Sequence, residues 1–283
     1  MDLCDLSQIK ALLARHGFRF SRSLGQNFLI EAWVPRQVAA ASGAAPGTGV
    51  LEVGPGVGPL TVQLADRADR VVSVETDRSL LPILAETLAS CPNAEVVPGD
   101  ILKTDIPALV EEKFAGLIPV ACANLPYNIT TPAITALIEA NCFVSITVMV
   151  QREVARRICA GPGTGDYGAF SVYCQYHTRP ELLFEVAPEC FVPAPKVTSA
   201  VVRMVPHPPP AEVDDPIHFF RVVRAAFALR RKTLLNSLSM AGPYTKETLS
   251  QALERCGLPG GVRGEQLSIL QFAQLSRALR GLI

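Results

Sequence analysis

The feature that most constrains the fold of this chain is an apolar run that ends in a glycine-rich turn, Gly49-Val-Leu-Glu-Val-Gly54-Pro-Gly56-Val-Gly58-Pro-Leu-Thr61. Glycines let the backbone approach a ligand closely, and the helix start that follows favours polar ligand groups. A second apolar run ends at Glu75, about 20 residues later, where an acidic side chain typically binds ribose hydroxyls. The pattern predicts an α/β domain that binds either a dinucleotide or S-adenosylmethionine.

The spacing of the glycines distinguishes between these two kinds of ligand. A dinucleotide-binding turn reads Gly-x-Gly-x-x-Gly, and Pro59 stands where its third glycine belongs. Glu52-x-Gly54-x-Gly56-x-Gly58 instead resembles the first motif of the class I methyltransferases. Asp100 follows a third apolar run and Asn124 a fourth, so four ligand-facing groups, the glycine turn among them, are expected at the carboxyl ends of parallel strands. We therefore expect S-adenosylmethionine as the cofactor.

The residues Asn124-Leu125-Pro126-Tyr127 form a compact reader of an exocyclic amine. The Asn124 side-chain oxygen and a main-chain carbonyl, of Leu125 or Pro126, can accept hydrogen bonds from one NH₂ group. Pro126 stiffens the turn, and Tyr127 offers a ring face on which a planar base can stack. Two acceptors favour a pyramidal, nucleophilic nitrogen, which methyl transfer to adenine requires. The alternative interpretation is an ordinary strand-to-helix turn.

Apolar runs alternate with helical patterns, which is typical of a parallel doubly wound sheet. Strands are expected near 49–53, 70–74, 94–98, 118–123 and 144–150, followed by two antiparallel strands near 182–186 and 200–205. A proline-rich linker follows at 206–210, and helical patterns then cover 217–228, 230–240, 246–256 and 265–280. We expect an α/β, Rossmann-like and mostly parallel sheet domain over residues 1–206 and a small all-helical domain over 207–283.

Composition limits the class of protein. About half of the residues are hydrophobic, yet no run of about 20 is uninterrupted, so we expect no membrane span. The eight cysteines are scattered without a Cys-x-x-Cys pair, so we expect reduced thiols and no metal site. The acidic start lacks a signal-peptide pattern, and a cytoplasmic location is expected.

The formal net charge is zero, but cations gather between His218 and Asn236, where no acidic residue occurs. A local basic patch on a neutral protein suits RNA phosphates, and a solvated helical surface is the alternative. A glycine-rich loop at 161–168, with Arg152 and Arg156, is a second candidate for phosphate contacts. The residues expected to bind RNA are Arg221, Arg224, Arg230, Arg231 and Lys232.

Together these motifs resemble the KsgA-type family of ribosomal RNA small-subunit adenine N6,N6-dimethyltransferases. Three further blocks carry the resemblance, at residues 23–29, 191–202 and 226–236. Two positions depart from the family pattern: Thr198 stands where Asp is expected, and Leu229 where a polar residue is usual.

The resemblance implies methylation of two adjacent adenosines in a 3′-terminal hairpin of small-subunit (16S) rRNA, with free rRNA or a pre-30S particle as partner and a monomeric enzyme that recognises RNA through residues 207–283. It implies catalytic roles for Asn124, Leu125, Pro126, Tyr127 and Phe191, with Phe191 stacking on the second face of the base. The implied cofactor-binding residues are Gln26, Asn27, Leu29, Gly54, Gly56, Gly58, Glu75, Thr76, Asp100, Ile101 and Asn124.

Three other functions share parts of this pattern. A large-subunit rRNA methyltransferase of the antibiotic-resistance kind has the same motifs, but the blocks at 23–29 and 191–202 favour the small-subunit type. A DNA adenine methyltransferase usually has Pro-Pro-Tyr after the acid or amide. A non-catalytic RNA-binding assembly factor needs loss of methyl transfer, whereas the expected cofactor and amine contacts are all intact.

Overall fold

The computed structural model describes residues 1–19 and 25–282, so Ser23 and Leu24 of the N-terminal block lie outside the described residues. The chain forms two compact units. Unit 1 comprises Met1–Ala155 and Glu181–Pro206, and unit 2 comprises Arg156–Pro180 and His207–Ile283. The expected boundary at residue 206 assigns 156–180 to the first domain, whereas its contacts group this segment with the C-terminal helices.

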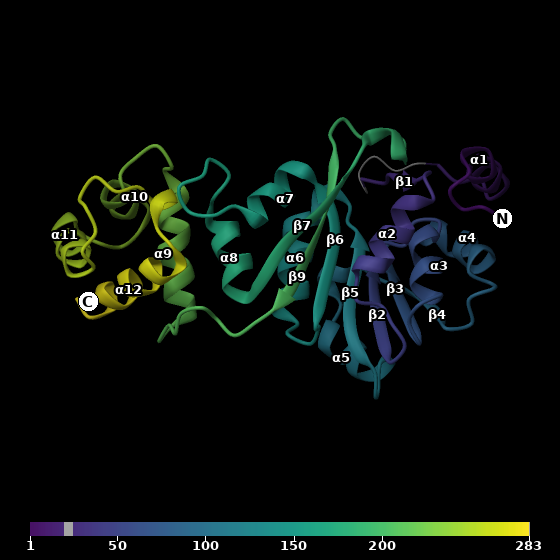
Figure 1. Ribbon diagram of the computed structural model, residues 1–283, viewed down its shortest axis with the longest axis horizontal. Coiled ribbons are helices and arrows are strands. Elements are labelled where there is room, and N and C mark those ends of the chain that lie inside the picture. Colours follow the sequence, from purple (N-terminus) through teal and green to yellow (C-terminus); the bar gives the residue numbers. More distant parts are fainter. Residues whose placement is uncertain (20–24, 283) are drawn as a thin grey trace. The chain divides into compact units, whose positions relative to one another are not determined.

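Unit 1 is built on a seven-stranded sheet in the order β4-β3-β2-β5-β6-β9-β7 (Figure 1). The five strands from β4 to β6 pair in parallel, and β9 is antiparallel to β6. The mostly parallel α/β sheet is therefore confirmed. In chain order the strands are β2 (Thr48–Val53), β3 (Arg70–Glu75), β4 (Ala94–Pro98), β5 (Ile118–Asn124), β6 (Ser145–Gln151), β7 (Thr178–Val186) and β9 (Ser199–Pro206).

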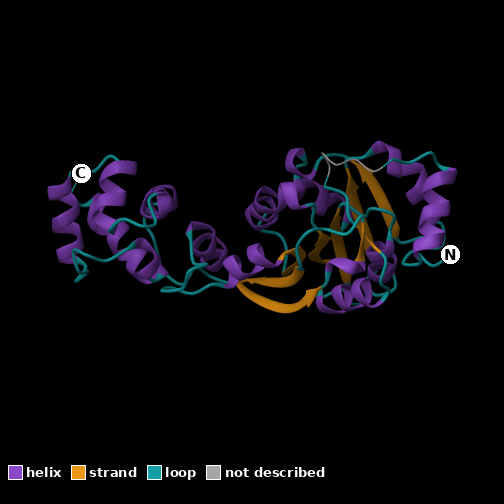
Figure 2. Ribbon diagram, turned by 90° about the horizontal axis from the view of Figure 1, so that it is seen from above, coloured by secondary structure: helices purple, strands orange, loops and turns teal. Residues whose placement is uncertain are grey.

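Helices cover both faces of the sheet in unit 1 (Figure 2). Because both faces are covered, the central strands β2 and β5 are buried at successive positions rather than at every second one. On one face, Val34 and Val38 of α2 and Leu64 of α3 pack with the buried residues of the sheet. The helices are α1 (Leu6–Arg15), α2 (Trp33–Ala41), α3 (Pro59–Ala65), α4 (Leu81–Thr87), α5 (Ile106–Lys113) and α6 (Thr130–Glu139), and α7 (Arg152–Cys159) begins in this unit.

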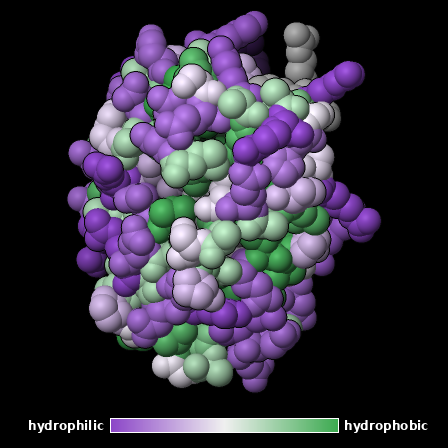
Figure 3. Space-filling view, turned by 90° about the vertical axis from the view of Figure 1, so that its right-hand side faces the viewer, coloured by the Kyte–Doolittle hydropathy of each residue, from purple (hydrophilic) through white to green (hydrophobic). Residues whose placement is uncertain are grey.

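Short elements complete unit 1. A separate two-stranded sheet pairs β1 (Phe28–Leu29) antiparallel to β8 (Phe191–Val192), which ties the N-terminal block to a segment far along the chain. Among the described residues of unit 1, the 3₁₀ helices are η2 (Arg78–Leu80), η3 (Ile101–Lys103), η4 (Tyr127–Ile129) and η5 (Pro188–Cys190). The face that carries α1 and α4 is mostly hydrophilic, with small hydrophobic groups between the polar residues (Figure 3).

Unit 2 is helical around its own apolar core, which includes the fully buried rings of Tyr167, Phe219 and Phe272. Polar caps decide where its helices begin. The Thr233 side chain accepts a hydrogen bond from the backbone N–H of Asn236, so α10 begins at Leu234 and not at the expected residue 230. The Ser268 side chain caps α12 in the same way, so this helix begins at Ile269 and not at the expected residue 265. The helices are α8 (Ala169–His177), α9 (Pro216–Ala228), α10 (Leu234–Ala241), α11 (Lys246–Arg255), the 3₁₀ helix η6 (Gly264–Gln266) and α12 (Ile269–Arg280).

All eight cysteines are free, and four of them are buried. Within the described parts of the chain, no helix is long and apolar enough to cross a membrane. The same residues contain no group of three or more side chains suited to hold a metal ion.

Candidate active site

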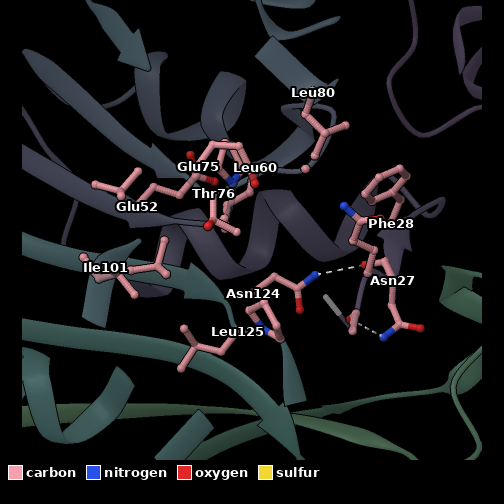
Figure 4. Close-up of a pocket in the computed structure, with 18 of the residues that line it drawn as sticks. Asn27, Phe28, Glu52, Leu60, Glu75, Thr76, Leu80, Ile101, Asn124 and Leu125 are labelled. Atoms are coloured by element: carbon pink, nitrogen blue, oxygen red, sulfur yellow. Dashed lines mark hydrogen bonds between the residues drawn. The ribbon is translucent and has the colours of Figure 1, made fainter. Parts of the chain in front are cut away.

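A pocket lies at the carboxyl edge of the sheet, where the strand order reverses between β2 and β5 (Figure 4). Open α/β sheets bind their ligands at such a switch point. The structure brings together most of the residues expected at the cofactor and amine sites. Those that line the pocket are Gln26, Asn27, Leu29, Gly54, Gly56, Glu75, Thr76, Asp100, Ile101, Asn124, Leu125, Pro126 and Tyr127.

The glycine-rich turn forms one wall of this pocket. Gly54 and Gly56 have φ of 67° and 62°, a left-handed conformation that other residues rarely adopt. A Cβ on Gly56 would lie 3.2 Å from the Phe28 ring, so this position requires a residue without a side chain. Gly58 does not line the pocket: it is the N-cap of α3, and a Cβ there would lie 3.0 Å from the Leu88 side chain at the end of α4.

Two buried acids face the pocket from β2 and β3. Glu75 is 5% exposed, and its Oε1 accepts from the backbone N–H of Asp77 at 2.7 Å. Glu52 is 1% exposed, and its Oε2 accepts from the hydroxyls of Thr61 and Ser73 at 2.7 and 2.6 Å. Burial raises the pKa of each carboxyl to about 7. These acceptors fit a ligand that carries hydroxyl groups and positive charge.

Asp100 and Ile101 form the wall that follows β4. Asp100 caps η3, because its Oδ1 accepts from the Leu102 N–H at 3.0 Å. Its Oδ2 lies 3.8 Å from Lys103 Nζ. Ile101 is 4% exposed and offers an apolar surface beside this carboxylate, which is suited to a planar heterocycle with an amino group.

The amide of Asn124 has a defined orientation. Its Nδ2 donates to the backbone carbonyl of Asn27 at 3.3 Å, and Asn27 Nδ2 in turn donates to the Gly25 carbonyl at 3.0 Å (Figure 4). A carbonyl oxygen can only accept, so the contact assigns Nδ2 to the Asn27 side and leaves Oδ1 as an acceptor. The N-terminal block thus orients the residue expected to read the amine.

The backbone around Asn124 supplies a second acceptor. The Pro126 carbonyl already accepts from Ile129 N–H and Thr130 Oγ1, each at 3.2 Å, which occupies both of its lone pairs. Among the described residues, no hydrogen bond reaches the Leu125 carbonyl. Of the two carbonyls that the sequence leaves open, Leu125 therefore provides the available one.

The two expected aromatic residues differ in placement. Tyr127 begins η4, lines the pocket, and its hydroxyl lies 2.7 Å from Ser199 Oγ. Phe191 is 3% exposed, pairs with Leu29 across the β1–β8 ladder, and belongs to the same core cluster as Val34. The second stacking surface expected from Phe191 is therefore not among the residues that line the pocket.

Sequence reasoning missed several pocket residues. Phe28 and Leu80 contribute apolar surface opposite Glu75 (Figure 4). Ser199 does not line the pocket but contacts Tyr127, and it was also missed, although it lies inside the 191–202 block; no local signal links it to Tyr127, 72 residues away.

All five of the expected RNA-binding cations are exposed, on α9 and on the turn before α10: Arg221, Arg224, Arg230, Arg231 and Lys232. Arg230 differs from the other four because its guanidinium has hydrogen-bond partners within unit 2. Its Nη2 donates to the carbonyls of Gly165 and Tyr167 at 2.6 and 3.1 Å, and it lies 3.4 Å from a Glu265 carboxylate oxygen. Arg230 therefore fastens the glycine-rich loop at 161–168 within unit 2.

A parallel sheet with a glycine turn, a buried acid on β3 and an amine reader after β5 defines a class I S-adenosylmethionine-dependent methyltransferase. The family model described as Ribosomal RNA adenine dimethylase matches residues 17–280. The chain belongs to this family, and it is an enzyme that uses S-adenosylmethionine to methylate adenine in ribosomal RNA.

Relatives of known name agree with this family. Two proteins called Ribosomal RNA small subunit methyltransferase A are each 45% identical over 98% of this chain and 97% of their own length, one from Geobacillus thermodenitrificans and one from Bacillus thuringiensis. Among solved structures, the 23S rRNA methyltransferase ErmE is 30% identical over 90% of this chain and 100% of its own, with a TM-score of 0.68. A dimethyladenosine transferase from Plasmodium falciparum shares the fold at 23% identity, covering 87% of this chain and 95% of its own, with a TM-score of 0.71.

Proposed function

We propose that this enzyme dimethylates N6 of two adjacent adenosines in a 3′-terminal hairpin of small-subunit (16S) rRNA, as a step in maturation of the small subunit. The observation that carries the proposal is the pair of acceptors at the switch point, Asn124 Oδ1 and the Leu125 carbonyl. Specificity for the small subunit is supported by the names of the relatives at 45% identity, whereas the ErmE match is at 30%.

When bound, S-adenosylmethionine supplies a methyl group on a positively charged sulfur. The residues of the pocket fit its parts. Glu75 is placed to accept hydrogen bonds from ribose hydroxyls, and Asp100 with Ile101 to hold the adenine ring by its amino group and one face. Gly54 and Gly56 leave room for the methionine end, and Asn27 and Leu29 cover it.

The target base must leave its stack to reach this pocket. Asn124 Oδ1 and the Leu125 carbonyl then each accept a hydrogen bond from the N6 amino group, and Tyr127 stacks on the adenine ring. The main work of the site is to align nitrogen, methyl carbon and sulfur for an in-line displacement. A strong base is not needed, because the N6 proton becomes acidic once the amine is cationic. One hydrogen remains after the first transfer, so a second transfer can follow.

We assign cofactor binding to unit 1 and rRNA recognition to unit 2. The exposed cations of unit 2 support this assignment, since backbone phosphates dominate the affinity of proteins for nucleic acids. The substrate that we propose is rRNA within a pre-30S particle, methylated by a monomeric enzyme in the cytoplasm.

Transfer of tritiated methyl groups tests this function. The purified enzyme is incubated with small-subunit particles, large-subunit particles and DNA, each from a strain that lacks the modification. We expect label as N6,N6-dimethyladenosine near the 3′ end of the small-subunit RNA and only background elsewhere. Label in large-subunit RNA favours the antibiotic-resistance alternative, and binding without label in any substrate favours the assembly-factor alternative.

A further inference from the structure

Ser199 lies where strand β9 enters the sheet, beside the candidate active site. Because β9 is antiparallel to β6, its first residue lies at the edge where the parallel strands end, and Ser199 pairs there with Gln151. Strand β6 also pairs with β5 at Asn124 and Met149. The topology thus brings a serine hydroxyl next to the turn that carries Tyr127.

The hydroxyls of Ser199 and Tyr127 lie 2.7 Å apart, within hydrogen-bond distance. Ser199 is fully buried, and Tyr127 lines the pocket. The phenol oxygen stands at the far end of the ring axis, so a hydrogen bond to it fixes the direction in which the ring extends. Pro126 and helix η4 fix the backbone end of the same side chain.

The pocket offers little else to hold the base by stacking. Phe28 is the other aromatic among the described residues that line it, and its ring packs against the glycine turn at Gly56. The Phe191 ring lies in the core. The orientation of Tyr127 therefore decides where the plane of a stacked base lies.

We propose that Ser199 is a positioning residue for methyl transfer, whose hydroxyl holds the Tyr127 ring in the orientation that stacks on the target adenine. The inference rests on the proposed function, since it takes Tyr127 as the stacking residue. A fixed ring aligns N6 with the acceptors of Asn124 and Leu125. A ring that swings leaves the base bound but misaligned, so the rate of transfer falls while substrate affinity is kept.

Three variants test the inference: Ser199→Ala, Tyr127→Phe and the double variant. Each removes the hydrogen bond and keeps the aromatic ring. At saturating rRNA particle and cofactor we expect each single variant to lower the single-turnover rate about 3- to 10-fold, the usual effect of one hydrogen bond. The dissociation constants of both ligands should stay unchanged. The double variant should be no slower than either single one, because both substitutions remove the same hydrogen bond.

Ser145→Ala is the matched control. Ser145 Oγ is a buried serine hydroxyl on β6 that has no hydrogen-bond partner among the described residues, so its removal should leave the rate unchanged. Additive rate decreases in the double variant, or a lowered melting temperature with a normal rate, overturn the inference. If Ser199→Ala fails to fold, Tyr127→Phe tests the same bond from the partly exposed partner.

Asn124→Ala separates this inference from the proposed function. If Asn124→Ala abolishes transfer while Ser199→Ala and Tyr127→Phe react normally, only the positioning role is wrong. If Asn124→Ala also transfers methyl groups at the normal rate, the proposed amine reader itself is wrong.

Discussion

Two buried carboxyls in the pocket, Glu52 and Glu75, titrate near neutral pH. Burial raises the pKa of each from 4.5 to about 7. The folded protein therefore binds more protons than the unfolded chain between these values, and this contribution lowers stability as pH rises through that window. The destabilisation that results from ionising these two buried carboxyls is fully present above the folded pKa. A cationic cofactor with ribose hydroxyls offsets it by interacting with the ionised carboxylates.

This linkage predicts how cofactor affinity depends on pH. From pH 6 to pH 8 we expect affinity for S-adenosylmethionine to increase and proton release on binding to decline, because Glu75 must be ionised to accept two hydroxyl hydrogens. Isothermal calorimetry in buffers of different ionisation enthalpy measures both quantities. Glu75→Ala should weaken binding by about 1–3 kcal/mol, the cost of an unmet polar partner, and reduce the pH dependence. Glu111→Ala, at an exposed acid on α5, serves as the control and should change neither.

Asn124 carries the next prediction at this scale. Asn124→Ala should reduce methyl transfer by at least about 100-fold, since the acceptor that it removes acts mainly when the amine becomes the nucleophile. The affinity for rRNA should be nearly normal. Cofactor affinity can also fall, because Asn124 contacts the N-terminal block through Asn27. Single-turnover assays with filter binding separate the two effects, and a variant with near-normal turnover contradicts the amine-reader role.

At the scale of elements, the parallel strands were the easiest part to predict from sequence. A strand buried on both faces is mostly apolar along its length, and β2 at Thr48–Val53 and β3 at Arg70–Glu75 match their expected ranges to within a residue. Strand β7 instead begins at Thr178, before the expected residue 182, because pairing with β9 at the sheet edge extends it through a polar stretch. The β1–β8 pair also depends on contacts between distant segments.

The residues of the candidate site also fall into two groups, those that the sequence predicts and those that are placed by pairing between distant segments. Glu75 and Asn124 are visible in sequence, because each follows an apolar strand and the carboxyl ends of such strands converge. Phe191 was expected beside the base, but pairing of β8 with β1 takes its ring into the core. The bond between Ser199 and Tyr127 depends on the antiparallel entry of β9. Residue type alone does not encode these long-range placements.

Arg230 provides the prediction for the α9–α10 turn. Its two hydrogen bonds to backbone carbonyls hold the loop at 161–168, so Arg230→Ala should destabilise this loop by about 1–3 kcal/mol, as expected for hydrogen bonds from a charged donor. Hydrogen exchange should become faster in that loop. Arg231→Ala, one residue away and exposed, is the matched control and should leave the loop's exchange unchanged. Equal exchange in both variants would falsify the anchoring role.

At the scale of the whole molecule, charge is unevenly distributed rather than large. The formal net charge is zero, yet unit 2 carries the exposed cations Arg221 and Arg224 on α9 and Arg231 and Lys232 on the following turn. A net charge of zero gives no general attraction to polyanions, so we propose that the patch acts through a few contacts with RNA phosphates. The two units can therefore be tested separately, by cofactor binding and by the salt dependence of rRNA binding.

The last prediction compares two double variants that remove the same charge. If the patch on unit 2 binds phosphates, Arg231→Ala with Lys232→Ala should weaken binding of small-subunit particles and flatten the slope of log affinity against log salt by about 0.7–0.9 for each phosphate that is no longer neutralised. Lys10→Ala with Arg67→Ala removes two exposed cations of unit 1 and should leave the slope unchanged. Cofactor affinity should stay normal in both variants, because the pocket lies in unit 1. If the side chains of the patch only solvate its surface, both variants will instead show the same slope, and stability alone will change.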